Sequence, residues 1–249
     1  MGLKGDEIAL YLSGQPVPIK SCNIVIRQPT IKQIVAFKES DFLFAANYLG
    51  KPEMHIDRIR ADNPEQLAAY TDFQIYTALI RQDPNLKRSV ENFLTLVFPD
   101  YEISIEEEIN FVSDGRKVGM INPFNYEDFK KIVKNLFLFT KVGEKEYNPA
   151  NEKARKIAEK LRKGHEKISK MKADTNESAT LFGSYVSILS IGMNMDINIL
   201  YNYTPFQLYN VFIRYWRKVN SDFYQKVSTT PMMDVSKMEA PDDWSDTIY

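Results

Sequence analysis

The fold class is decided by the stretch TPFQLYNVFIRYWRKVNSDFYQKVS, residues 204–228. It opens with Thr204, Pro205 and Gln207, a pattern typical of a helix start. Thr is the capping residue before the helix, and Pro occupies the first helical position. Gln, at the third helical position, can accept a hydrogen bond from the backbone N–H of the capping Thr. Apolar residues then recur at helical spacing to the end of the stretch. The pattern predicts one long helix. We expect its buried face to consist of Leu208, Phe212, Trp216, Val219 and Phe223.

Helical signals also dominate the chain before this stretch. Short helices are expected at 30–38 and 41–49, and an apolar helix at 177–192. Asn63-Pro64-Glu65 and Asp83-Pro84 each read as a cap followed by Pro at the first helical position. The expected apolar faces are Leu67, Tyr70, Phe73, Ile75, Tyr76, Leu79 and Ile80 in the helix after Asn63, and Leu86, Val90, Phe93, Leu94 and Val97 in the helix after Asp83.

One more helix is expected from about Asn125. Asp128 stands three residues on, where a capping partner would stand. The apolar face of this helix would consist of Phe129, Ile132, Val133, Leu136 and Phe139.

Two stretches instead alternate apolar and polar residues, a period typical of strands. Residues 7–27 alternate on both sides of Gly14-Gln15-Pro16, and residues 102–121 alternate around Asp114-Gly115, a strong hairpin turn. We predict a β-hairpin in each stretch. The expected fold class is therefore mainly α with minor β, a helical body with two short β-hairpins.

Composition divides the chain into four segments. We expect an N-terminal α+β domain at 1–140, a basic amphipathic helical segment at 141–176, a C-terminal helical part at 177–230 and a flexible acidic tail at 231–249. The basic segment has eleven Lys and Arg against six Asp and Glu, and its apolar stripe is thin. A stripe of this kind needs a cover, so we expect a homo-oligomer or a partner protein.

The bulk properties exclude several classes of function. The chain of 249 residues has 32 basic and 33 acidic residues, which gives no case for nucleic acid as the main partner. The single cysteine, Cys22, excludes an intrachain disulfide and a Cys-rich metal site. No apolar run approaches the roughly 18 residues that span a bilayer, and the N-terminus lacks a signal-peptide pattern. We expect a cytoplasmic protein without a membrane partner.

Catalytic signals are poor. His55 and His165 are the only histidines, and neither stands in a zinc-binding spacing. The chain has no phosphate-binding loop of Walker type and no G-x-S-x-G elbow. Glu106-Glu107-Glu108 would point alternately to the two faces of a strand, so the triplet reads as a charged sheet edge and not as a cation site. We predict no catalytic, cofactor-binding or metal-binding residues and expect no enzyme.

The end of the chain combines three features. TPFQL at 204–208 opens a helix rich in Tyr, Arg and Lys, a linker with Met and acids follows, and PDDWSDTI at 241–248 comes last. This combination resembles the C-terminal portion of tail assembly chaperones from phages and prophages of Gram-positive bacteria. QPTIKQI at 28–34 is similar to the P-x-[IL]-K-x-[IL] motif near the N-terminus of those proteins. The chain departs from the pattern at Ser245, where an apolar residue is expected, and in the length added by 141–176.

The resemblance implies a non-catalytic role in the host bacterial cytoplasm. Chaperones of this family coat the long helical tape measure protein before the tail tube polymerises, recruit tube subunits, and leave before the virion is finished. The implied partners are therefore the tape measure protein and the major tail tube protein. A chain with both the N-terminal domain and the acidic tail corresponds to the long form made by ribosomal frameshifting, or to a fused version.

The acidic tail is the expected recruiting element. It carries a single large aromatic residue among acids, a pattern suited to an apolar pocket with a basic rim. The alternative is an acidic end that only aids solubility. The residues expected to bind the tube subunit are Asp242, Asp243, Trp244 and Ile248.

Other functions stay open at this point. The second reading is a structural virion protein, such as a neck, connector or baseplate component that stays in the virion. A nucleic-acid-associated regulator would use the basic helix at 152–172. An enzyme is the least favoured reading, because no convergent set of polar residues can be named.

Overall fold

The computed structural model describes residues 3–62, 64–138, 180–230, 240–241 and 243. Within these residues the chain is mainly helical, with one two-stranded and one three-stranded antiparallel sheet. The expected fold class, mainly α with minor β, is confirmed. The basic helical segment expected at 141–176 lies outside the described residues, as does most of the expected tail.

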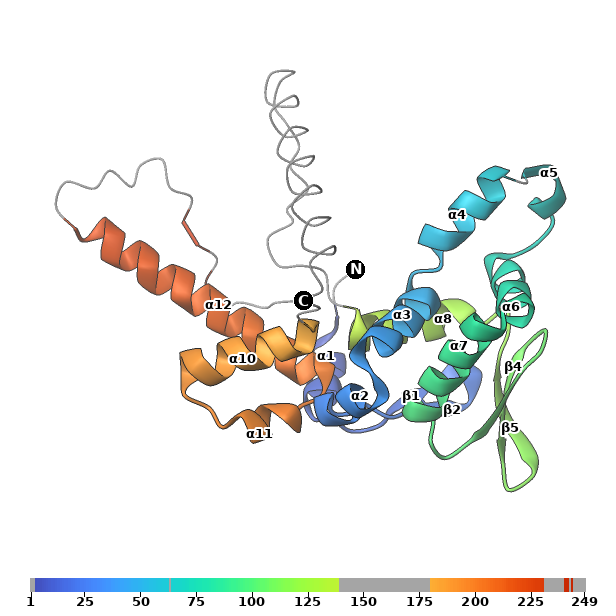
Figure 1. Ribbon diagram of the computed structural model, residues 1–249, viewed down its shortest axis with the longest axis horizontal. Coiled ribbons are helices and arrows are strands. Elements are labelled where there is room, and N and C mark those ends of the chain that lie inside the picture. Colours follow the sequence, from blue (N-terminus) through green and yellow to red (C-terminus); the bar gives the residue numbers. More distant parts are fainter. Residues whose placement is uncertain (1–2, 63, 139–179, 231–239, 242, 244–249) are drawn as a thin grey trace, which may run out of the picture.

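The elements follow one another along the chain as Figure 1 labels them. The strands are β1 (Val17–Ile19), β2 (Ile24–Ile26), β3 (Glu102–Ile105), β4 (Ile109–Ser113) and β5 (Arg116–Ile121), and a 3-10 helix, η1 (Lys20–Cys22), joins the first two. The helices are α1 (Gly5–Leu12), α2 (Ile31–Phe37), α3 (Glu39–Gly50), α4 (Glu53–Asp62), α5 (Pro64–Leu67), α6 (Asp72–Gln82), α7 (Pro84–Val97), α8 (Tyr126–Phe137), α10 (Leu181–Met193), α11 (Ile197–Tyr201) and α12 (Pro205–Ser228).

Several helices begin at the residues that the sequence predicted as caps. The Thr204 hydroxyl accepts a hydrogen bond from the Gln207 backbone N–H at 3.3 Å, and Pro205 holds the first position of α12. A carboxylate oxygen of Asp83 accepts a hydrogen bond from the Leu86 backbone N–H at 3.2 Å at the start of α7. Each cap satisfies backbone donors that the first helical turn leaves without a partner.

The single helix predicted after Asn63 is wrong. The structure breaks it into α5 and α6, because Thr71 and Gln74 form a capping box that starts α6. Arg60 fixes the break by donating to the backbone oxygens of Leu67 at 3.1 Å and Tyr70 at 2.8 Å. The helix that carries Arg60, α4, was not predicted.

The predicted hairpin at 7–27 is half correct. Residues 5–12 form the helix α1 and no strand, and the hairpin consists of β1 and β2, which pair Val17 with Ile26. Residues 8–12 are all apolar, so Ile8 and Tyr11, three residues apart, also fit one helical face. Packing decides between the two, because the buried Tyr11 meets the ring of Phe206 on α12 edge-on at 5.3 Å.

The predicted hairpin at 102–121 has three strands and not two. Asp114 and Gly115 form the β4–β5 turn, both with positive φ, as expected. The run Glu106-Glu107-Glu108 is a second turn, between β3 and β4, so these carboxylates do not line a sheet edge as predicted. Glu108 instead forms an ion pair with Lys117 at 3.2 Å.

The expected capping role of Asp128 is also wrong. Asn125 precedes α8, but its side chain makes no capping hydrogen bond to the helix. It turns toward β5 and η1 and donates from Nδ2 to the backbone oxygens of Met120 at 2.9 Å and Ser21 at 3.1 Å. Its amide therefore ties α8 to the sheets.

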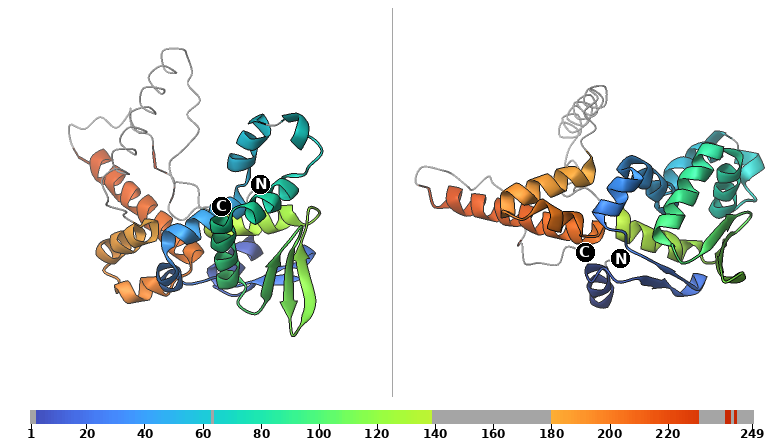
Figure 2. Two further views of the ribbon diagram at one scale, coloured as in Figure 1. Left: turned by 45° about the vertical axis from the view of Figure 1, so that its right-hand side comes forward. Right: turned by 60° about the horizontal axis from the view of Figure 1, so that its bottom comes forward.

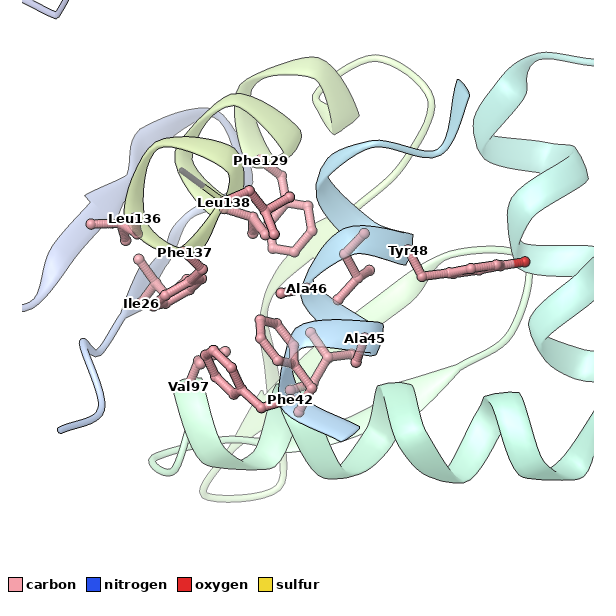
Figure 3. Close-up of a cluster of buried hydrophobic side chains, with 14 of the residues drawn as sticks. Ile26, Phe42, Ala45, Ala46, Tyr48, Val97, Phe129, Leu136, Phe137 and Leu138 are labelled. Atoms are coloured by element: carbon pink, nitrogen blue, oxygen red, sulfur yellow. The ribbon is translucent and has the colours of Figure 1, made fainter. Parts of the chain in front are cut away.

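The core is centred on α3, which packs against α7 and α8 (Figure 3). Phe42 on α3 meets Phe93 on α7 and Phe137 on α8, with ring centroids 5.1 Å and 5.3 Å away. Ala45 and Ala46 keep α3 thin, so the neighbouring helices approach closely.

The C-terminal helices join the same core. A buried carboxylate oxygen of Glu39 on α3 accepts a hydrogen bond from the Phe182 N–H at the start of α10 at 3.0 Å. The Ile31 N–H donates to the backbone oxygen of Tyr203 at 2.8 Å. α10, α11 and α12 thus lie at one end of the molecule, with the three-stranded sheet and α4–α6 at the other (Figure 2). Among the described residues, no helix has both the length and the apolar character to cross a membrane.

Candidate protein-interaction site

The two halves of α12 differ in burial. The first half, up to Ile213, packs into the core, and the second half projects from the molecular body (Figures 1 and 2). The predicted burial of Trp216, Val219 and Phe223 is therefore wrong, since these side chains are 48%, 39% and 58% exposed. Sequence spacing identified the apolar face correctly but could not show where its cover ends.

We call this face the α12 seam and define it as Phe212, Trp216, Val219 and Phe223. The four residues are spaced by four, three and four, the spacing of helix-binding faces in coiled coils. In a helix this spacing places all four on one side, as a stripe that continues from the core into solvent.

The seam is covered only as far as α10 reaches. Tyr185 on α10 stacks on Phe212 with ring centroids 4.1 Å apart. Farther along, Gly192 lies directly against the hydroxyl end of the Tyr215 side chain. α10 ends at Met193, whereas α12 continues to Ser228. The uncovered part of α12 thus extends along the helix for about 18 Å at the usual rise per residue.

The apolar surface extends over α10 and α11. Of the fifteen large apolar side chains that are exposed in the described part of the chain, nine belong to α10, α11 and α12. Asp196 is the only charged residue between positions 180 and 204. Depletion of charge around exposed apolar residues is typical of the centre of protein interfaces. The exposed apolar residues on α10 and α11 are Leu181, Ile188, Ile191, Met193, Ile197 and Ile199.

Charge on α12 itself is basic. The helix carries four basic residues and one acid, Asp222, which forms an ion pair with Lys218 at 2.7 Å. A partner that lies along the seam would therefore be favoured by acidic residues at its flanks.

Of the four residues predicted to bind the tube subunit, the structure describes only Asp243. Asp242, Trp244 and Ile248 lie outside the described residues. Asp243 is described, and its backbone oxygen accepts a hydrogen bond from Nη1 of Arg217 on α12 at 3.4 Å. Whether these four residues form one binding element stays a prediction.

Other candidate chemistry in the sequence leads to no described site. Cys22 is buried in η1, and burial raises the pKa of its thiol to about 11, so the thiol stays protonated at neutral pH. Among the described residues, no group of His, Cys, Asp and Glu side chains is arranged to hold a metal ion. His165 lies outside them.

Comparison of the chain with protein-family models, with curated proteins and with solved structures finds no match in any of the three.

Proposed function

We propose that this protein is a non-catalytic tail assembly chaperone that binds a helical segment of a phage tape measure protein along the α12 seam. The exposed seam carries the proposal. A 4-3-4 apolar stripe that leaves the core and continues into solvent is what an amphipathic partner helix needs, because such a helix buries its own apolar face in the contact.

The partner helix would extend the packing that α10 begins. It would lie on the uncovered half of α12, in line with the face that Tyr185 occupies nearer the core. Its acidic flanks would meet the basic side chains of α12. The resemblance at 204–249 supplies the identity of the partner, because tape measure proteins are long and helical.

The second part of the proposal concerns recruitment. Asp242, Asp243, Trp244 and Ile248 would bind a subunit of the major tail tube and bring it to the coated tape measure protein in the host cytoplasm. One chain would then hold two partners, the first on a helix face and the second on the acidic tail.

The class of function is tested on purified particles. The protein should be absent from mature virions by quantitative mass spectrometry, yet co-purify with the tape measure protein from infected or co-expressing cells. A stoichiometric presence in virions would identify it as a structural neck, connector or baseplate component instead.

Recruitment is tested by loss of the aromatic residue of the tail. Trp244→Ala should weaken capture of the major tail tube protein by at least about 30-fold, because a Trp bound in a pocket contributes about 2 kcal/mol or more. A chain that ends at Thr230 should lose capture altogether, while both variants keep the helical circular dichroism spectrum of the full chain. Equal capture by all three proteins would place the binding surface on the helical body.

A further inference from the structure

α10 has an exposed apolar face that the α12 seam does not include. We call it the α10 stripe and define it as Leu181, Ser184, Ile188 and Ile191. The four positions are spaced by three, four and three residues, so they share one side of the helix. Leu181, Ile188 and Ile191 are 41%, 44% and 83% exposed. The stripe therefore faces solvent along most of α10.

The stripe can be covered without leaving a polar side chain unpaired. Ser184 is its one polar member, and the hydroxyl of Ser184 donates to the backbone oxygen of Thr180 at 2.9 Å. This hydrogen bond lies within the helix, so it persists when another surface covers the serine. α10 also carries no charged residue, so its stripe can lose its water without desolvating a charge of its own.

The absence of charge favours a second copy of this chain as the cover. Paired helices select a foreign partner largely through charged residues beside the apolar stripe, and α10 has none. A charged partner helix would lose hydration here without gaining an opposite charge. α12 differs, because it carries four basic residues that favour an acidic partner. A second α10 brings no charge to the contact and matches this face better than a charged helix does.

The spacing of the stripe is the same when read from either end. In an antiparallel pair of α10 helices, Leu181 would therefore lie opposite Ile191 of the second copy. Ser184 would lie opposite Ile188 of the second copy, so that the small side chain makes room for the large one. Such a pair uses the same surface on both copies around a two-fold axis, and the assembly stops at the dimer.

The length of the stripe limits the strength of the contact. From Leu181 to Ile191 the stripe extends for about 15 Å at the usual rise per residue. One helix pair of this length is smaller than a standard stable interface, which buries roughly 800 Å² on each partner. We therefore expect a dissociation constant on the order of 10 µM, in the range of weak dimers.

We infer that this protein forms a homodimer in which two α10 helices pack antiparallel through the α10 stripe. The contact uses α10 and not residues 141–176, the segment whose composition led us to expect an oligomer. Each dimer presents two α12 seams, so one long helical protein can be held at two points. That consequence rests on the proposed function, whereas dimerisation is measured without any partner.

The test is sedimentation equilibrium of the full chain over a range of concentrations. The unmodified chain should change from monomer to dimer around the expected dissociation constant. Leu181→Lys and Ile191→Glu should each weaken dimerisation by at least about tenfold, because each places a charge against an apolar side chain at both ends of the contact. Val35→Lys is the matched control, since Val35 on α2 is 45% exposed, and it should dimerise like the unmodified chain.

A mixture of the two variants tests the antiparallel pairing itself. In the mixed dimer the new lysine would lie opposite the new glutamate, and the unchanged Ile191 would lie opposite the unchanged Leu181. The mixture should therefore dimerise more tightly than either variant alone. In a parallel pair, position 181 would lie opposite position 181, so mixing would restore nothing.

Hydrogen exchange of the unmodified chain gives a second test that needs no substitution. The backbone amides of α10 should exchange more slowly at high protein concentration than at low concentration, while those of α2 should not change. This measurement decides the matter if either variant fails to give the helical circular dichroism spectrum of the unmodified chain.

Three results would overturn the inference. They are a chain that stays monomeric at concentrations about tenfold above the expected dissociation constant, stripe variants that dimerise as tightly as the unmodified chain, and a mixture that shows no gain over the separate variants. None of these measurements contains the tape measure protein or the tube protein. A failure of dimerisation therefore leaves the proposed function to be decided by its own experiments.

Discussion

Replacing Trp216 and Phe223 together with alanine should strongly weaken binding to the helical partner while leaving the fold intact. Both side chains are about half exposed on the projecting part of α12 and contribute little to the core. Surface substitutions of this kind usually change the free energy of unfolding by less than about 1 kcal/mol. As buried anchors in an interface, two aromatics at about 2 kcal/mol each would lower the affinity by roughly a factor of 1,000.

The measurement is a titration of the partner helix by calorimetry, together with thermal unfolding of each variant. Phe124→Ala is the matched control, since Phe124 is 96% exposed and lies far along the chain from α12, just before α8. It should bind as tightly as the unmodified chain. A large drop in melting temperature for the double variant, with unchanged affinity, would assign the seam to folding and remove the proposed binding site.

Phe42→Ala should destabilise the protein by about 3–5 kcal/mol, the usual cost of removing a fully buried aromatic side chain from a core. Phe42 is 0% exposed and meets one aromatic ring on α7 and another on α8, so its loss leaves a cavity where three helices join (Figure 3). The melting temperature should fall by roughly 10 °C or more for a chain of this size.

Phe44→Ala provides the comparison from the same helix. Phe44 lies two residues farther along α3 and is 48% exposed, so its truncation should cost less than about 1 kcal/mol. Equal destabilisation by the two variants, measured by urea unfolding, would contradict the packing of α3 at the centre of the core.

Local chemistry determined where several helices begin. Thr204 and Gln207, and likewise Asp83 and Pro84, act on backbone groups within three residues of themselves, so sequence alone is sufficient to place the starts of α12 and α7. The same holds for the turn at Asp114 and Gly115, whose backbone conformation depends on those two residues. The apolar faces of these helices also follow from spacing alone.

Short alternating patterns were decided only by tertiary contacts. Residues 5–12 fit a strand and a helix face almost equally, and the contact of Tyr11 with Phe206, nearly 200 residues away, selects the helix. The turn at 106–108 was hidden for a related reason. Ile105 and Ile109 keep the alternation going through the turn, although they belong to two paired strands.

In the α12 seam, too, local sequence determines one property and tertiary packing determines another. Sequence alone determined that Phe212, Trp216, Val219 and Phe223 share one side of a long helix, because that depends only on helical geometry. Whether that side is core or surface depends on a second helix, and α10 ends at Met193 before it can cover Trp216. Burial is a property of two elements together, so only the tertiary structure decided that this stripe faces solvent.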